Sequence, residues 1–113
     1  MTKLIAAIAL AAAVATTTSV ETVWKTRQAL AGKSVTVKGK VVKYNGGILG
    51  VNWIHLQDGT GNAKDNTNDL TVTSTDETKV GAEITVTGVV TINKDLGSGY
   101  NYPVIIEKAK IAR

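Results

Sequence analysis

The 113-residue sequence contains no cysteine, and this absence excludes several kinds of chemistry. Without thiols the chain forms no disulfides, thiolate nucleophiles, cysteine zinc sites or haem attachments through a C-x-x-C-H motif. A single domain of this length buries roughly two-thirds of the surface of its unfolded chain, so it needs no covalent cross-links. The chain is therefore expected to fold as one domain around a hydrophobic core.

Histidine is almost as scarce, since His55 is the only one. A second histidine for a metal site is lacking, and no serine stands in a recognisable motif with a histidine and an acid. The segment 58–69 is rich in the oxygen ligands that calcium prefers, but an EF-hand frame starting at Asp65 places Leu70 where glycine is required. We expect a solvated loop there, and no catalytic residue, metal site or cofactor.

One apolar run stands out, twelve residues from Leu4 to Ala15, preceded by the positive charge of Lys3. It ends in the A-x-A cleavage pattern of secretory signal peptides. Twelve apolar residues are too few to span a bilayer comfortably, so no stable membrane span is expected. Residues 1–15 are interpreted as a signal-peptide-like segment of a periplasmic or extracellular protein. The alternative is an apolar helix that is retained and buried between subunits.

Charge is unevenly distributed along the sequence, whose formal net charge is +4. Residues 25–43 hold six basic side chains and no acid, whereas residues 58–83 hold six acids and two lysines. For binding of a polyanion, this placement matters more than the mild net charge.

Apolar spacing predicts a short helix followed by β structure. Val20, Val23 and Leu30 suit an amphipathic helix over 20–30, with Ser19 as its N-cap. Alternation of apolar and polar residues then predicts five strands. Their expected ranges are 34–44, 52–57, 70–73, 83–92 and 102–111. The only proline, Pro103, falls near the start of the last strand, where a missing N–H donor does least harm.

Two of these strands share a pattern, G-x-x-[VI]-T-V-x-G-x-V, separated by 49 residues. The repeated residues are Gly32, Thr36, Val37, Gly39 and Val41, which recur as Gly81, Thr85, Val86, Gly88 and Val90. A glycine inside a strand marks a bulge or a bend, and two bent strands suit a small closed barrel. The alternative is chance, because V-T-V-x-G is common in β proteins.

Three runs of residues are similar to one protein family. They are GKSVTVKGKVV at 32–42, GVNWIHLQDGTG at 50–61 and KDLGSGYNYPVIIE at 94–107. The chain resembles small exported bacterial OB-fold proteins, NrfJ-related and labelled nucleotide- or DNA-binding-like. The run WIHLQD is also similar to a strand of anticodon-binding OB domains. The resemblance implies an all-β fold, a five-stranded OB-fold barrel over 32–113, preceded by an N-terminal helix within 16–31.

Alternation along 52–57 points Ile54 and Leu56 toward the core, so the other side chains of this strand face outward. Together with lysines of the neighbouring strand they would form one basic and aromatic platform, on the ligand face of OB folds. Two tyrosines after the fourth strand are secondary candidates. The predicted ligand-binding residues are Trp53, His55, Gln57, Lys38, Lys40, Tyr100 and Tyr102. Alternatively, Trp53 covers the barrel floor or packs on the N-terminal helix.

These features favour a non-enzymatic, exported binding module. Its ligand would be single-stranded nucleic acid or another polyanion, with a glycan or a protein as other partners. The alternative is a structural subunit of an extracellular or cell-surface assembly. Such a homo-oligomer or filament would form through the N-terminal segment and strand edges.

The signal-peptide interpretation predicts that the native protein lacks residues 1–15. Lys3, the apolar run and the A-x-A pattern together direct cleavage after Ala15. Intact mass spectrometry of protein from its natural host measures the N-terminus directly. A native species that retains Met1 would contradict the interpretation and favour assembly over binding.

Overall fold

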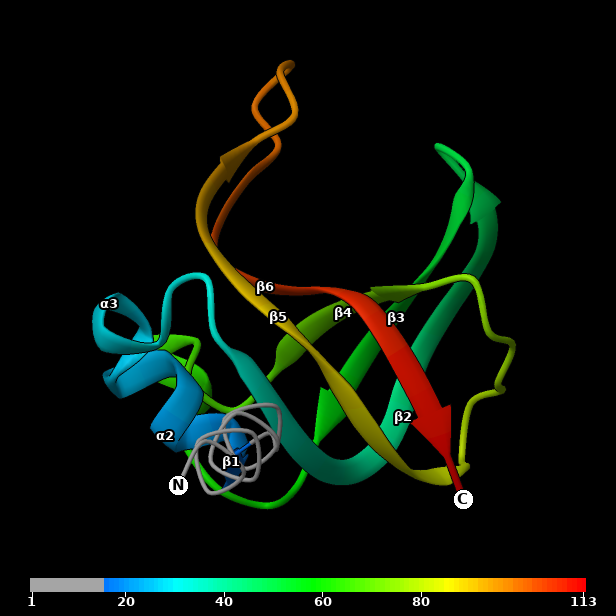
Figure 1. Cartoon of the computed structure of the whole chain (residues 1–113), viewed down its shortest axis with the longest axis horizontal. Helices are drawn as coiled ribbons and strands as arrows, with labels where there is room; N and C mark the ends of the chain where they lie inside the picture. The colour runs from blue at the N-terminus through cyan, green and yellow to red at the C-terminus, as the bar shows by residue number, and fades with distance from the viewer. Residues whose placement is uncertain (1–15) are drawn as a thin grey trace, which may run out of the picture.

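The computed structural model describes residues 16–113, and the predicted signal-like segment 1–15 lies outside the described residues. The chain is mostly β, with short helices before the five strands, as the sequence predicts (Figure 1). The elements are β1 (Thr16–Thr18), α2 (Val20–Lys25), α3 (Arg27–Leu30), β2 (Ser34–Ile48), β3 (Val51–Gln57), the 3-10 helix η1 (Ala63–Asp65), β4 (Leu70–Ser74), β5 (Glu83–Asp95) and β6 (Asn101–Ala112).

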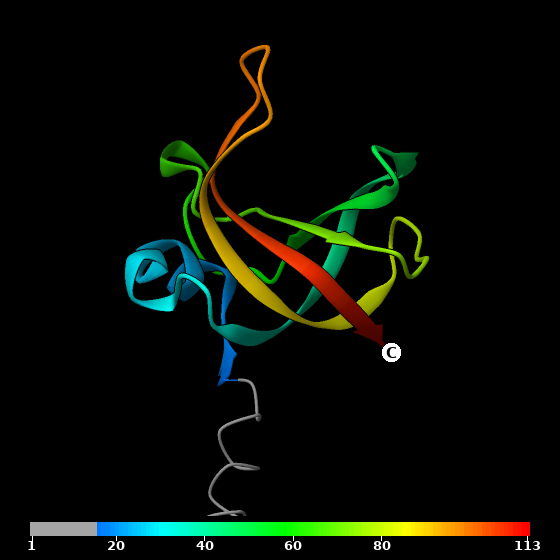
Figure 2. The same cartoon turned by 45° about the horizontal axis from the view of Figure 1, so that its top comes forward.

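The strands form one sheet that closes on itself. Their order is β1-β2-β3-β4-β6-β5, and β5 pairs back to β2, which completes a ring of hydrogen bonds. All neighbours are antiparallel except β1–β2 and β4–β6, which are parallel. The views in Figures 1 and 2 show the resulting barrel, with the helices gathered at one end.

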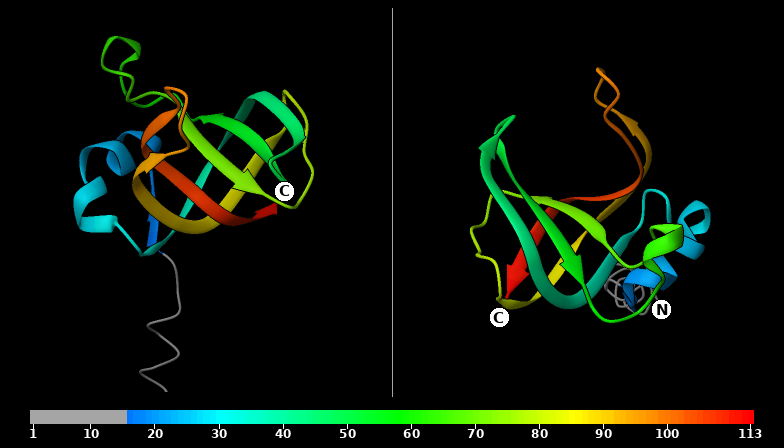
Figure 3. Two further views of the ribbon diagram at one scale, coloured as in Figure 1. Left: turned by 90° about the horizontal axis from the view of Figure 1, so that it is seen from above. Right: turned by 180° about the vertical axis from the view of Figure 1, so that it is seen from behind.

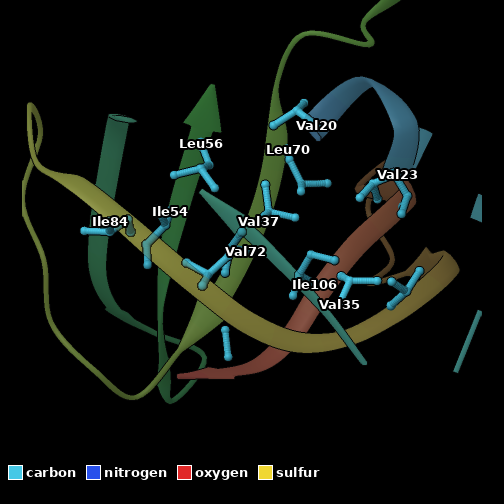
Figure 4. Close-up of a cluster of buried hydrophobic side chains, with 14 of the residues drawn as sticks. Val20, Val23, Val35, Val37, Ile54, Leu56, Leu70, Val72, Ile84 and Ile106 are labelled. Atoms are coloured by element: carbon cyan, nitrogen blue, oxygen red, sulfur yellow. The ribbon is translucent and has the colours of Figure 1, made fainter. Parts of the chain in front are cut away.

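Alternate residues of β2, β3 and β5 fill the barrel, together with buried residues of β4 and β6. Ile54 and Leu56 of β3 are fully buried, as the alternation predicts, and they share one cluster with Val37 and Val86. Helix α2 adds Val20 to the same cluster, so it closes the end of the barrel (Figure 4). Burying each such side chain contributes about 1.5–3 kcal/mol, so the core is the main source of stability.

The 49-residue repeat corresponds to a local twofold relation between β2 and β5, which pair with each other. At one end of the pair, the N–H of Gly32 donates to the carbonyl of Val90 at 2.7 Å. At the other end, the N–H of Gly81 donates to the carbonyl of Val41 at 2.8 Å. The two donors, Gly32 and Gly81, occupy equivalent positions in the repeat, and so do the two acceptors, Val41 and Val90. The predicted correspondence between the two strands is confirmed.

Gly39 lies where β2 changes its partner. Residues 34–40 pair with β5, and from Lys40 onward the strand pairs with β3. A Cβ atom at Gly39 would lie 2.7 Å from the carbonyl oxygen of Gln57, closer than real Cβ atoms approach backbone. Glycine is therefore required here because two backbones approach closely at the bend.

Gly88 has the equivalent role in β5, opposite a β-bulge. Two residues of β6, Lys108 and Ala109, stand opposite this one glycine, because the register shifts between Thr87 and Val89. A Cβ at Gly88 would lie 2.8 Å from the carbonyl oxygen of Glu107. Both glycines predicted to mark bends thus lie at close contacts that close the barrel.

The N-terminal segment differs from the single expected helix. Ser19 is the N-cap, as predicted, and its Oγ accepts from the N–H of Thr22 at 3.1 Å. The helix breaks at Thr26, whose hydroxyl donates to the carbonyl of Thr22 at 2.7 Å and so competes for the helical backbone. Residues 16–18, three β-branched threonines, form β1 rather than helix.

No helix within 16–113 is long and apolar enough to cross a membrane.

Two strands extend three or four residues beyond their predicted ends. β2 continues to Ile48 instead of Tyr44, and β5 continues to Asp95 instead of Ile92. Both extensions lack clear apolar alternation because they leave the barrel as hairpins, where neither face covers the core. The β2–β3 and β5–β6 hairpins form two arms that rise from the same side of the barrel (Figure 1).

Replacing either bend glycine by valine is expected to destabilise the fold. Overpacking costs about 1–3 kcal/mol, and here the obstacle is rigid backbone, so Gly39→Val and Gly88→Val should each reach at least that range. Lys38→Ala, at an exposed neighbouring position, should change stability by no more than about 0.5 kcal/mol. Chemical denaturation of the three variants measures the differences. An unchanged midpoint for either valine variant would contradict the close contact.

Candidate binding groove

A groove lies between the two arms of the barrel. One side is lined by Leu49, Val51 and Trp53 of the β2–β3 hairpin, and the other by Lys94 and Leu96 of the β5–β6 hairpin. Its floor is formed by residues 73–75, at the end of β4, and residues 107–110 of β6. Figure 3 shows the two arms from above and from behind, on either side of this space.

Trp53 is held in the groove by contacts at both arms. Its ring centroid lies 5.8 Å from that of Tyr102, with 34° between the ring planes. Its indole N–H donates to the carbonyl of Ile48 at 2.8 Å. The other indole, Trp24, belongs to the N-terminal helix α2. Of the two tryptophans, Trp53 is thus the one that lines the groove, together with residues of the two hairpins.

The groove has more basic than acidic side chains. Lys94, Lys108 and Lys110 line it against one acid, Glu107. Lys108 has a φ of +54°, in the left-handed region that side chains rarely adopt, and this conformation belongs to the bulge opposite Gly88. The same bulge that closes the barrel therefore brings Lys108 into the groove.

Glu107 is fixed by two partners on β5. The Thr91 hydroxyl donates to Oε1 at 2.7 Å, and Lys94 Nζ lies 3.1 Å from Oε2. Burial raises the pKa of Glu107, but the hydrogen bonds from Thr91 and Lys94 outweigh burial and hold the pKa below its ordinary value. The carboxylate is therefore ionised at neutral pH and only accepts hydrogen bonds.

His55 and Gln57 lie on the outward face of β3, as predicted, but they bind another part of the chain. His55 Nδ1 lies 2.7 Å from Asp69 Oδ1, and Gln57 Nε2 donates to Asp69 Oδ2 at 3.0 Å. The Asp69 carbonyl accepts from the indole N–H of Trp24 at 2.7 Å. These two predicted residues thus connect β3 to the start of β4 and to α2, and they do not line the groove.

The groups bound to Asp69 also lower the pKa of its carboxyl group. Burial raises the pKa of Asp69, but bonds from His55 and Gln57 outweigh it, and the charge of Lys43 lowers the pKa further. Lys43 pairs with His55 across the two strands because β2 has a bulge between Val41 and Lys43. The result is an ionised carboxylate at the centre of a polar cluster.

Lys38 and Lys40 line a second hollow, separate from the groove. Both are exposed, and they line it together with Gln57 and Glu83. Lys40 pairs with Gln57, which lies four residues along β3 from Trp53, roughly 13 Å at the usual rise of a strand. The predicted lysines thus lie beside Gln57 at one end of β3, and Trp53 lies toward the other end, in the groove.

The two tyrosine candidates differ in position. Tyr102 is half-buried and packs against Trp53, beside the groove. Tyr100 lies at the tip of the β5–β6 hairpin and is 62% exposed. Tyr102 is thus placed with Trp53, while Tyr100 projects from the end of the arm.

The four charged residues of the groove do not follow from strand alternation in the sequence. Strict alternation from Ile106 points Lys108 inward, but the bulge reverses the direction of the following side chains. The buried residues Ile106 and Ala109 are three positions apart instead of two. That irregular spacing, opposite a glycine in the partner strand, is the signal that could have located the bulge and its lysines.

The D-G-T-G sequence after β3 anchors the N-terminal helix. Asp58 Oδ2 accepts from the N–H of Val20 at 2.9 Å, and Thr60 Oγ1 accepts from the N–H of Glu21 at 3.0 Å. Asn62 similarly caps η1. The oxygen atoms of this segment thus satisfy helix N-termini, and residues 16–113 contain no group of three histidine or acidic side chains arranged to hold a metal ion.

Comparison with known proteins identifies a shared fold. No protein-family model matches the sequence, and no curated protein matches it. The barrel is similar to part of a crystal structure assigned as an aspartyl-tRNA synthetase from Leishmania major Friedlin, with a TM-score of 0.57 and 13% sequence identity. The similarity covers 86% of this chain and 20% of that chain. This chain therefore spans one-fifth of that protein, and the likeness concerns the fold alone.

The cap formed by Asp58 makes stability depend on pH. Burial raises the pKa of Asp58, but hydrogen bonds from Thr60 and Val20 hold it below its ordinary value of 3.8. Because the pKa of Asp58 is lower in the folded state, its ionised carboxylate stabilises the fold at pH values above the ordinary pKa. This stabilisation is lost as the pH falls through the folded-state pKa. Asp58→Ala should therefore cost about 1 kcal/mol at neutral pH, typical of a lost cap.

Urea denaturation of Asp58→Ala and of the parent chain at several pH values checks this dependence. The difference in unfolding free energy should shrink as pH falls below 3.8. Asp65→Ala, in the exposed helix η1, is the matched control. A difference that stays constant down to the acid limit of the folded state would contradict an ionised cap.

Proposed function

We propose that this chain is a non-enzymatic OB-fold module that binds single-stranded nucleic acid, or another polyanion, along the groove between its two arms. The observation that supports this best is the aromatic pair Trp53 and Tyr102 beside a groove lined by three lysines. Bases stack on aromatic rings, and lysines attract the phosphates that follow the bases along a strand.

The barrel supports the OB-fold assignment. Five strands, β2 to β6, close a ring in which β4 and β6 pair in parallel, consistent with a five-stranded Greek-key barrel. The structure with a similar fold is assigned as an aspartyl-tRNA synthetase, a name that denotes action on an RNA. Fold likeness alone does not carry function, so the groove residues remain the principal support.

Export is part of the same proposal. It is supported by Lys3, the apolar run to Ala15 and the resemblance to exported proteins. We place the module in the periplasm or outside the cell, where its ligand would be a polyanion met in that compartment.

Assembly is the second candidate function, and β1 is the observation that favours it. Among the described strands, β1 ends the sheet and pairs only with β2, so its outer edge is open. An open edge can pair with a strand of another chain. Size-exclusion chromatography with light scattering, together with electron microscopy, separates a monomer from a filament.

Binding of a fluorescein-labelled single-stranded oligonucleotide, measured by anisotropy, tests the groove. Trp53→Leu should weaken binding on the order of ten-fold, as expected for loss of one stacked base. Lys110→Gln and Lys108→Asn should each weaken it and reduce the slope of log affinity against log salt by about 0.7. Asparagine is chosen at Lys108 because it tolerates the left-handed backbone better than most residues.

The control variants separate the groove from the second hollow. Lys64→Gln, in helix η1, should leave the affinity and the salt slope unchanged. Loss of binding with Lys38→Gln and Lys40→Gln, but not with Lys110→Gln, would place the ligand in the second hollow and contradict the groove. Binding of neutral oligosaccharides without salt dependence, and of no oligonucleotide, would replace the polyanion by a glycan.

A further inference from the structure

Glu107 is the only acidic side chain among the described residues that line the groove. The other charged residues of the groove are lysines: Lys94 Nζ lies 3.1 Å from its carboxylate, and Lys108 follows it on β6. A carboxylate at this place weakens the attraction of the lysines for phosphate. General polyanion binding therefore does not explain why an acid lies there.

The carboxylate is held in a fixed orientation. Thr91 donates to one of its oxygens at 2.7 Å, and Lys94 lies 3.1 Å from the other. The side chain is 27% exposed, so it remains accessible from the groove. Each carboxylate oxygen has two lone pairs, and after these two contacts each oxygen can accept one more hydrogen bond. The groove thus presents two preoriented acceptors side by side.

We propose that Glu107 selects bases whose Watson–Crick edge donates hydrogen bonds, guanine above all. Guanine presents its N1–H and its N2 amino group side by side, which matches the two oxygens of a carboxylate. Thymine and uracil present one N–H between two carbonyl oxygens, which the carboxylate repels. Unpaired bases expose this edge, so the inference rests on the single-stranded ligand proposed above and specifies it further.

The neighbouring groups complete the recognition. Trp53 lines the same groove and offers a stacking surface, while Lys108 and Lys110 attract the backbone of the strand. Glu107 then discriminates between bases that these sequence-independent contacts would accept alike. Its fixation by Thr91 and Lys94 limits the entropy lost when a base binds.

Three labelled thymidine octamers test the selection by anisotropy with the full chain. They carry guanine, hypoxanthine or thymine at one central position. Hypoxanthine keeps the N1–H of guanine but lacks its amino group, so it removes one of the two donors. Affinity should fall in the order guanine, hypoxanthine, thymine, with a difference of about ten-fold between the first and the last, as expected for a bidentate contact.

Glu107→Gln should reduce the guanine-to-thymine ratio to about two-fold or less. It should also strengthen binding of the all-thymine octamer, because the groove loses a negative charge. A merely structural role would weaken all three octamers equally. Glu83→Gln, in the second hollow, is the matched control and should leave the ratio unchanged.

The outcomes distinguish this inference from the function on which it rests. Equal affinity of the parent chain for all three octamers would overturn base selection by Glu107 and leave the binding groove in place. No binding of any octamer would overturn both. If Glu107→Gln does not fold, the hypoxanthine series with the parent chain still tests base selection, because equal affinities would overturn it.

Discussion

The structure depends on the close antiparallel contact between β2 and β5. Their pairing closes the sheet into a ring, while Gly39 lets β2 approach β3, and Gly88 lets β5 approach β6, where a Cβ atom would collide. The bend at Gly39 lets β2 leave β5 and pair with β3, while the bulge opposite Gly88 turns β6. Both arms, and hence the groove between them, follow from these two contacts.

The core and the bends could be predicted from the sequence because they depend on local patterns. Period-two alternation identified Ile54 and Leu56 as buried, and a repeated glycine identified the two bends. These features need no knowledge of which strands are neighbours. The outward direction of Trp53 follows from the same rule, although the ligand role of Trp53 stays a prediction.

The charged part of the groove could not be predicted in this way. The bulges in β2 and β6 reverse the inside and outside positions that follow them, and so they set the directions of Lys43 and Lys108. The sequence carries no glycine at these bulged positions; their cause is the curvature that closure imposes on the sheet. Alternation within one strand does not reveal this constraint, and the irregular spacing of Ile106 and Ala109 does so only once Gly88 of β5 is known to lie opposite.

Tertiary hydrogen bonds also decided the roles of several polar residues. Asp58 reads as a turn or ligand residue in isolation, yet it caps a helix that begins 38 residues earlier. Asp69 similarly binds His55 and Gln57 and accepts from an indole 45 residues earlier. Such partners are brought together only after the barrel has formed. The run GVNWIHLQDGTG at 50–61 therefore serves the attachment of α2 as much as any ligand.

The separation of the two tryptophans gives the molecule two independent optical reporters. The indole of Trp24 is tied to the Asp69 carbonyl between α2 and the barrel, so its emission follows docking of the N-terminal helix. The indole of Trp53 stands in the groove against Tyr102, so its emission follows what enters between the arms. With only these two indoles in the sequence, removal of either one leaves tryptophan emission from a single site. Loosening of the helix and occupation of the groove can therefore be followed separately in the same protein.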